Sequence, residues 1–347
     1  RLILVTRYDN RRDSKNLSFV SKVNELDFIP ISNFISIKFY RLFSAITDIK
    51  NVIKISNHIV VRLPSFIGLL TLVLASNKKN IIVELVGCPL DTFKNHSKVG
   101  RLISYFMYIL TRYFVRNASN VIYVTKFYLQ KKYPTNTKSF LSCSDVEIIV
   151  SENLNDERFS KIKEKSNSFV IGMIGNLNSK YKGFDIALKT LKLLVETNNS
   201  NFTLELVGGG KNKKIEDLIT KYNLQKNVRF IGFRSHPDQV FDWLDKVDFY
   251  IHPSKSEGLP RSLIEAMSRG CCCFGSNVGG IPELLDPKYI HSPNDFKRLY
   301  NMILEHIDIN ERLVNIKKCF EVSKNYNKEI LDKLRSEFYE NYFNSFK

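Results

Sequence analysis

Apolar runs of strand length alternate with helical patterns along the second half of the chain. The pattern predicts strands at Phe169–Ile174, Phe202–Val207, Val228–Ile231, Phe249–His252 and Cys271–Phe274. It predicts helices between them, at Phe184–Val195, Lys213–Tyr222, Gln239–Leu244 and Arg261–Ser268. Strands and helices that alternate in this way form βαβ units, so we expect a parallel sheet covered by helices on both faces.

The first half carries a similar but less regular pattern. It predicts strands at Leu2–Thr6, Ile59–Arg62, Ile81–Val86 and Val121–Val124, and helices at Ser65–Ala75 and Arg101–Val115. The chain begins at Arg1, and no glycine-rich loop follows its first strand. Because the first residue is not methionine, we expect that the true N-terminus is missing.

Residues 153–168 are polar and charged with little periodicity, which is typical of a linker between domains. We expect one domain over residues 1–160 and a second over residues 161–326. A charged amphipathic helix, Asn327–Phe346, is predicted within a last segment, residues 327–347.

The composition is that of an ordinary globular protein, with 44% hydrophobic and 25% charged residues. The longest apolar stretch, Leu102–Val115, is shorter than the ~20 residues that a membrane-spanning helix needs, and it contains Arg112. No basic segment followed by an apolar one marks a secretory signal at the start. We therefore expect a cytoplasmic protein, or one at the inner face of the cell membrane.

The net charge of +17 is concentrated in the first half, where residues 1–165 hold 26 basic and 13 acidic side chains. A basic surface attracts nucleic acid, anionic lipid or phosphorylated ligands. Lysines that merely solvate the surface would give the same charge. The charge alone therefore does not choose among these partners.

The cysteines show no spacing typical of a zinc site, a redox pair or a disulfide framework. We expect them to be small, buried, reduced side chains. They are Cys88, Cys143, Cys271, Cys272, Cys273 and Cys319.

Two glycine-bearing loops follow predicted strands. The first, residues 171–185, contains Gly175, Asn176, Lys180 and Lys182, and a lysine at the carboxyl end of a parallel strand suits a phosphate. The second, residues 206–211, contains Gly208, where a backbone without side chains allows a ligand to approach closely. Solvated lysines and a tight βα turn would explain the same residues without a ligand.

A third motif, residues 252–266, places two carboxylates around the start of a helix. Glu257 lies in the loop after a strand, Pro260 suits the first helical turn, and Glu265 lies on the helix. Carboxylates accept hydrogen bonds from hydroxyls, while the free N–H groups of Gly258–Arg261 favour an anion. One site could thus hold sugar hydroxyls, a diphosphate and a ribose. Taken alone, Glu265 is explained equally well by the helix dipole.

These motifs together resemble those of the retaining glycosyltransferases of family GT4. A further segment, Val278–Glu283, resembles the loop that this family carries after the next strand, and the similarity spans about residues 169–285. The resemblance implies an α/β protein of GT-B fold, with two Rossmann-like domains whose parallel sheets face each other across a cleft. It also implies that the last helix crosses back to the first domain.

The resemblance implies roles for particular residues of the second domain. Glu257 would contact hydroxyls of the donor sugar, Glu265 would bind the ribose, and Lys182 would hold the diphosphate. Gly258 and Leu259 would present backbone donors. The donor-binding loops would supply Lys180, Gly175, Asn176 and Gly208.

One residue departs from the family pattern, which often has arginine where this chain has Asn176. An amide supplies no charge, so either Lys180 compensates or turnover is slower.

The first domain offers weaker candidates for contact with the acceptor. Asp91 is the first choice as a catalytic residue, followed by His96 and Glu84, although each could equally be a loop cap or a surface residue. The segment Arg101–Arg116 combines aromatic residues with arginines and could rest on an anionic membrane. We favour instead a helix packed on its sheet.

The resemblance predicts transfer of a sugar from a UDP- or GDP-sugar to a hydroxyl with retention of configuration. The expected acceptor is a lipid-linked glycan in bacterial surface polysaccharide synthesis such as capsule, O-antigen or exopolysaccharide. No D-x-D motif occurs, so neither a metal nor another cofactor is expected. A transferase that uses a soluble sugar or sugar-phosphate acceptor is one alternative. A basic protein that binds nucleic acid without catalysis is another, although we expect no nucleic acid.

Overall fold

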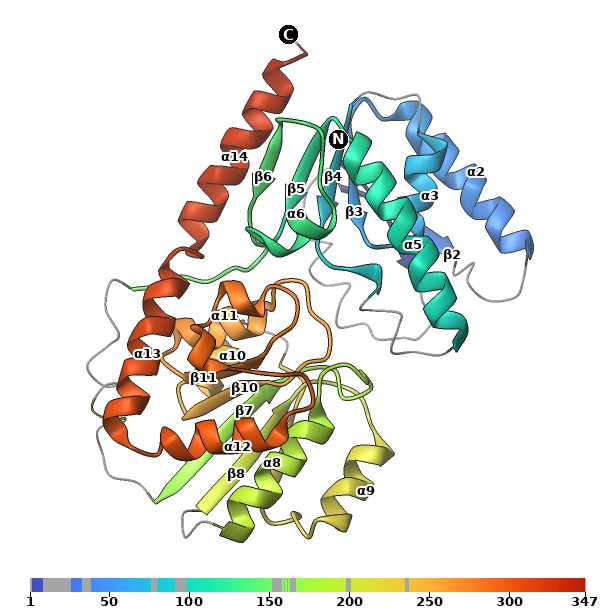
Figure 1. Cartoon of the computed structure of the whole chain (residues 1–347). Helices are drawn as coiled ribbons and strands as arrows, with labels where there is room; N and C mark the ends of the chain where they lie inside the picture. Colours follow the sequence, from blue (N-terminus) through green and yellow to red (C-terminus); the bar gives the residue numbers. More distant parts are fainter. Residues whose placement is uncertain are drawn as a thin grey trace.

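The computed structural model describes residues 2–8, 26–32, 39–75, 80–90, 98–151, 158, 160, 162, 167–197, 201–234 and 237–346. These residues form two α/β parts, drawn one above the other in Figure 1. Every strand pair within their sheets is parallel.

The first part is built on a sheet with the strand order β3-β4-β5-β6, beside a separate pair, β1-β2. The helices α2, α3 and α5 lie together along one side of it (Figure 1). Its elements are β1 (Leu2–Tyr8), β2 (Leu26–Ser32), α2 (Phe39–Ile55), β3 (Ile59–Leu63), α3 (Phe66–Leu74), β4 (Ile81–Leu85), α5 (Lys98–Asn117), β5 (Asn120–Tyr123), α6 (Tyr128–Lys132) and β6 (Phe140–Ser142).

The second part is built on a sheet with the strand order β12-β11-β10-β7-β8-β9. Its elements are β7 (Ser168–Ile174), α8 (Phe184–Thr197), β8 (Asn201–Val207), α9 (Lys213–Lys221), β9 (Val228–Gly232), α10 (Pro237–Leu244), β10 (Phe249–His252), α11 (Arg261–Ser268), β11 (Cys272–Ser276), η1 (Ile281–Glu283), η2 (Pro287–Tyr289), β12 (Ile290–His291), α12 (Phe296–Glu305) and α13 (Ile309–Lys324). The last helix, α14 (Lys328–Asn344), lies beside β6 of the first part (Figure 1).

The order of this second sheet reverses between β7 and β10. From β7 the chain builds outward through β8 and β9, and it then returns to place β10, β11 and β12 on the other side. Ligands of open parallel sheets bind outside the carboxyl ends of the strands at such a reversal. The loops that leave β7 and β10 therefore define the place to look for a site.

The core of the second sheet is apolar and tightly stacked. Phe169 on β7 stacks on Phe202 at 5.4 Å between ring centroids, and Phe249 on β10 stacks on Phe274 at 6.4 Å. All six cysteines are buried and free of disulfides, as expected, and three of them extend this core at the start of β11. Burial raises the pKa of the Cys271 thiol to about 12, so it stays protonated at neutral pH.

The strands and helices expected from the sequence are present, with ends that shift by a few residues. The sequence pattern missed β2, α2, α12 and α13, among others. In α13 the reason is visible, because Arg312, Asn315 and Ser323 are buried on its inner face. Polar residues that are buried and hydrogen-bonded hide the apolar period on which the prediction depends.

The C-terminal helices contact both parts of the molecule (Figure 1). On α13, Asn315 exchanges two hydrogen bonds with the backbone of Cys273, at 2.9 and 3.1 Å. On α14, the Arg335 guanidinium donates to the Ser144 carbonyl at 2.9 Å. The proposed domain limits at residues 160 and 326 remain a prediction, because most of the segment 152–166 lies outside the described residues.

Glu283 forms a second connection between the two parts. Its carboxylate, at the end of η1, accepts from the backbone N–H groups of Lys126 at 2.6 Å, Phe127 at 3.1 Å and Tyr128 at 2.6 Å. These amides belong to the start of α6, where N–H groups lack partners within the helix. A carboxylate at that position satisfies the amides and complements the helix dipole.

We predict that Glu283→Gln weakens this connection. The amide side chain carries no charge and replaces one acceptor oxygen by a donor, so the loss should be about 1–2 kcal/mol, as for other helix caps. Hydrogen exchange of the amides at 126–128 should become roughly tenfold faster, and the melting temperature should fall. Glu321→Gln, at an exposed glutamate of α13, serves as the control. Unchanged exchange in Glu283→Gln would show that this carboxylate does not hold the two parts together.

Candidate active site

Two glycines bring together the loops that leave neighbouring strands. Gly183 has a φ of +80°, and a β-carbon there would lie 2.0 Å from the carbonyl oxygen of Pro253, just after β10. Gly208 has a φ of +146°, and a β-carbon there would lie 2.0 Å from the carbonyl oxygen of Gly175. Both positions therefore exclude any side chain, and this close approach places the loops after β7, β8 and β10 against one another.

Glu257 is the centre of a compact polar cluster between these loops. Its Oε1 accepts from Lys182 Nζ at 2.7 Å, from His252 Nε2 at 2.8 Å and from Ser254 Oγ at 2.7 Å. Along the chain, the elements from α8 to β10 lie between Lys182 and Glu257. The sheet reversal brings them together, because β7 and β10 are neighbours.

The cluster holds Glu257 in its ionised form. Burial by itself would raise the pKa of this carboxyl, but the Lys182 ammonium and the hydrogen bonds from His252 and Lys182 outweigh it and lower the pKa to about 2. Burial also lowers the pKa of His252, against the attraction of Glu257. His252 is therefore neutral at pH 7, and it must donate its Nε2 proton because a carboxylate can only accept.

The cluster leaves one carboxylate oxygen of Glu257 for a ligand. Among the described residues, every hydrogen bond that Glu257 makes ends on Oε1. The Glu257 side chain is 10% exposed and the Lys182 side chain 16% exposed. Oε2 can therefore accept from a hydroxyl, while the Lys182 ammonium, which has three protons, can still donate to an anion.

The first part of the molecule approaches this cluster at Gly258. A β-carbon at Gly258 would lie 2.2 Å from the carbonyl oxygen of Val86, which directly follows β4. Gly280 donates its N–H to the Gly258 carbonyl at 2.6 Å, and Leu259 beside it is buried. The carboxyl ends of β4 and β10 thus meet at one point between the two sheets.

Glu265 lies on α11, downstream of Glu257, and its environment is different. Burial raises the pKa of its carboxyl, and Arg261 opposes this only in part. The helix that carries it begins at Arg261, so Pro260 occupies the capping position and not the first turn, which corrects the expectation from the sequence. Glu265 is half-buried, and a carboxylate that loses part of its water without a close cationic partner is costly unless a ligand hydroxyl reaches it.

Asn176 and Lys180 occupy the rim of the first glycine loop. The Asn176 side chain is exposed, and its Oδ1 accepts from the N–H of Asn178 at 2.9 Å, so the amide stabilises its own turn. Lys180 is exposed and forms no ion pair within the described chain, whereas Lys182 does. The two lysines of this loop therefore differ: Lys182 is paired with Glu257, whereas Lys180 is exposed to solvent.

The acceptor candidates of the first part are placed only in part. Asp91 and His96 lie outside the described residues. Glu84 lies on β4 and pairs with Arg62 on the neighbouring strand β3, at 3.7 Å between Nε and Oε2. This ion pair explains Glu84 without a ligand.

Three residues with clear roles in the structure, His252, Ser254 and Glu283, were not predicted from the sequence. His252 and Ser254 lie within the third motif, three to five residues before Glu257. The polar residues His252 and Ser254 at the end of an otherwise apolar strand were the feature of the sequence that could have pointed to a site. Glu283 also stood in a recognised motif, but its partners are about 155 residues away along the chain, so no local pattern could reveal them.

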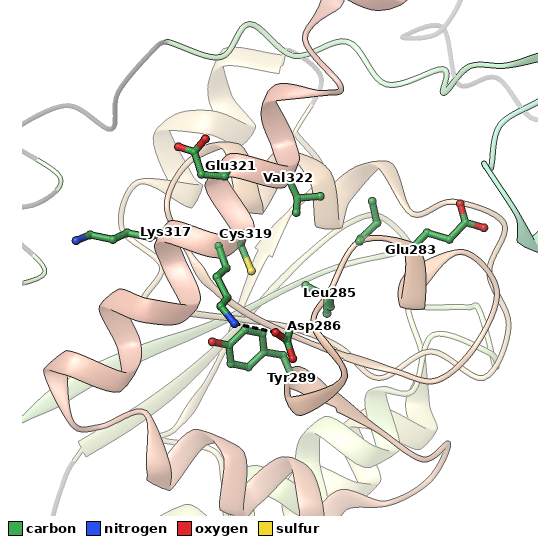
Figure 2. Close-up of a pocket in the computed structure, with 10 residues that line it drawn as sticks. Glu283, Leu285, Asp286, Tyr289, Lys317, Cys319, Glu321 and Val322 are labelled. Carbon is green, nitrogen blue, oxygen red and sulfur yellow. Dashed lines mark hydrogen bonds and ion pairs between the residues drawn. The ribbon is translucent and has the colours of Figure 1, made fainter.

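A pocket of about 530 Å³ lies between α13 and the segment from η1 to η2 (Figure 2). Val322 of α13 faces Leu285 and Tyr289 across it, and an ion pair joins Lys318 to Asp286 at 2.8 Å. None of the residues of the Glu257 cluster lines this pocket. It is therefore separate from the candidate active site.

Comparison with known proteins identifies the family. The sequence profile of the family Glycosyl transferases group 1 matches residues 155–318. Protein CapJ of Staphylococcus aureus is 34% identical over 268 residues, which cover 77% of this chain and 66% of CapJ. The chain belongs to the group 1 glycosyltransferases, family GT4. The aligned part of this GT4 chain spans just under two thirds of CapJ.

Solved structures confirm the GT-B fold of this GT4 chain. HepE of Anabaena, solved with UDP and glucose, has a TM-score of 0.70 at 16% identity, and the match covers 98% of both chains. Sucrose-phosphate synthase of Thermosynechococcus elongatus has a TM-score of 0.72 at 17% identity, and the match covers 93% of this chain and 82% of that one. The predicted family and the predicted α/β fold class are thus confirmed.

We predict that Glu257 contributes an acid-dependent part of the stability. Its pKa of about 2 lies below the ordinary 4.5, so the contribution is complete above pH 4.5 and is lost as the pH falls toward 2. This difference corresponds to on the order of 3 kcal/mol. Denaturant titrations across this range should show a shallower acid loss in Glu257→Gln than in the wild type.

Glu340→Gln, at an exposed position of α14, should keep the acid loss of the wild type. An equally steep loss in Glu257→Gln would mean that Lys182 and His252 do not hold this carboxylate ionised in the folded protein.

Proposed function

We propose that this GT4 chain transfers a sugar from a nucleotide-sugar donor to a hydroxyl of a glycan acceptor, with retention of configuration and without a bound metal ion. The observation that carries the proposal is the Lys182–Glu257 pair, 2.7 Å apart at the carboxyl ends of β7 and β10. It combines a cation for a diphosphate with a carboxylate for sugar hydroxyls. The family assignment supports this reading of the pair.

Lys182 would stabilise the leaving group. As the bond between the anomeric carbon and the diphosphate oxygen breaks, its electron pair stays on the nucleoside diphosphate. A fixed ammonium in a site shielded from water offsets this developing charge. The acceptor oxygen forms the new bond on the same face of the sugar, and its proton passes to a donor phosphate oxygen.

Glu257 and Glu265 would bind the two ends of the donor. Oε2 of Glu257 would accept from hydroxyls of the sugar, while its Oε1 keeps Lys182 in place. Glu265 would accept from the ribose hydroxyls. Gly258 and Leu259 would supply backbone donors, and the loops with Gly175, Asn176, Lys180 and Gly208 would complete the donor site.

We infer a glycan acceptor, lipid-linked and part of a bacterial surface polysaccharide, and the similarity to CapJ supports this inference. Asp91 is the proposed acceptor-side residue, five residues after Val86 in the sequence. A soluble sugar or sugar-phosphate acceptor is the alternative. A nucleic-acid-binding role without catalysis would leave the Lys182–Glu257 pair without a purpose.

Release of nucleoside diphosphate tests the donor site directly. The purified chain is incubated with a panel of UDP- and GDP-sugars, and its melting temperature is measured with UDP and with GDP. UDP is the first choice, because the similar HepE was solved with UDP and glucose. We expect one nucleotide to stabilise the fold and the matching sugar donor to be slowly hydrolysed. Lys182→Ala should reduce this release about 100-fold or more.

Two further lysine variants control this test. Lys226→Ala removes an exposed lysine before β9 and should release nucleotide at the wild-type rate. Lys180→Ala separates the possibilities raised by Asn176, since a large loss would mean that Lys180 supplies the missing charge. If no nucleotide stabilises the fold and no nucleotide sugar is hydrolysed, the proposed function is rejected.

We predict opposite effects of Glu265→Gln on stability and on binding. Burial raises the pKa of this carboxyl, so its ionised form costs stability as the pH rises, and the neutral amide should preserve or raise the melting temperature at pH 7. The amide accepts more weakly from ribose hydroxyls, so nucleotide binding should weaken about tenfold to 100-fold. Calorimetric titration with the stabilising nucleotide measures this, and a variant that is destabilised but binds normally would contradict the assignment.

A further inference from the structure

One face of α5 is apolar and points away from the protein. Tyr105, Phe106, Ile109 and Tyr113 have exposures of 59%, 62%, 49% and 60%. Their spacing places them on one side of the helix, over about 12 Å of its axis. In Figure 1, α5 lies on the outside of the first part, beside α3. We call these four residues the outer face of α5.

The opposite face of α5 is buried and mixes hydroxyl with apolar side chains. Ser104 is 1% exposed and Thr111 is fully buried, together with Met107 and Val115. The Thr111 hydroxyl has no hydrogen-bond partner among the described residues. A helix between a core and water normally buries its aromatic residues and exposes its hydroxyls. On α5 the buried side holds Ser104 and Thr111 beside Met107 and Val115, whereas three aromatic rings and Ile109 lie on the exposed side, so water is a poor match for the outer face.

The charge of α5 is of one sign. The helix contains Lys98, Arg101, Arg112 and Arg116 and no acidic residue. Arg112 and Arg116 are exposed next to the outer face, and Arg112 donates to the hydroxyl of Tyr108 at 2.9 Å. The surrounding half of the chain is basic as well. A partner for this surface must therefore be apolar at its centre and negative around it.

We infer that the outer face of α5 docks on the surface of an anionic phospholipid bilayer. Tyrosine and phenylalanine suit the boundary between head groups and acyl chains, and arginines pair with lipid phosphates. No described helix is long and apolar enough to cross a membrane, so the contact would be peripheral. The helix expected to pack on its sheet does so with one face and offers the other to lipid.

This inference deepens the proposed function, and its biological use rests on that function. Val86, against Gly258, directly follows β4, and α5 is the next long helix along the chain. A bilayer against α5 would thus lie beside the part of the molecule that is proposed to receive a lipid-linked acceptor. Lipid binding itself can be measured without any donor or acceptor.

Vesicle co-sedimentation tests the inference. The wild type is mixed with vesicles of phosphatidylcholine alone and with vesicles of equal parts phosphatidylcholine and phosphatidylglycerol. We expect binding to the anionic vesicles and little binding to the neutral ones. Ile109→Ser should weaken anionic binding about tenfold, because it removes apolar surface from the contact. Arg112→Gln should weaken it less and reduce its dependence on salt.

Ile330→Ser is the matched control, because Ile330 on α14 is 47% exposed, like Ile109 at 49%, but lies away from α5. It should bind vesicles as the wild type does. Failure of the wild type to bind, or equal binding by Ile109→Ser, would overturn the inference. So would a wild-type dimer that Ile109→Ser dissociates without any change in vesicle binding, since a second copy would then cover the face.

Hydrolysis of the nucleotide sugar without lipid is measured in the same samples. Ile109→Ser should leave this rate unchanged. Vesicle binding without hydrolysis would count against the proposed function alone, whereas hydrolysis without vesicle binding would count against the membrane contact alone.

Discussion

At three glycines the backbone of one segment lies directly against the backbone of another, and the geometry of the site follows from these contacts. Gly183 touches the carbonyl of Pro253, Gly208 touches that of Gly175, and Gly258 touches that of Val86. The first two contacts join loops of the second sheet, and the third joins the two sheets. A methyl group at any of them would push apart the segments that carry the polar cluster.

The Glu257 cluster shows how a charged group is kept in a largely buried place. Burial alone would raise the pKa of the carboxyl, and the Lys182 ammonium and neutral His252 reverse that tendency. For Glu265, further along the same segment, burial raises the pKa and Arg261 opposes this only in part. The protein therefore stabilises the charge of one carboxylate more than that of the other. Glu257 is stabilised without a ligand, whereas Glu265 would gain a partner from the proposed ribose hydroxyls.

The two parts of the molecule are joined by polar contacts near this site and by the C-terminal helices. Glu283 caps the start of α6, and Arg335 of α14 donates to Ser144. These contacts are hydrogen bonds to backbone groups, which specify one relative orientation. The outer face of α5 lies elsewhere on the first part and takes no share in them. The surface proposed for lipid is therefore free to act without disturbing the donor site.

Local sequence patterns were enough to predict the strands and helices between residues 169 and 274, the three motifs and the resemblance to the family. Periodicity and glycine-bearing turns are local signals, and they need no knowledge of the fold. The three-dimensional fold alone shows that Lys182, His252 and Ser254 meet on one oxygen of Glu257, and that Glu283 reaches α6. The fold also shows which face of α5 is buried. The polar residues Ser104 and Thr111 lie on that face, so the pattern of apolar residues along the helix does not reveal it. These facts depend on contacts between residues distant along the chain, which the order of strands in the sheet creates.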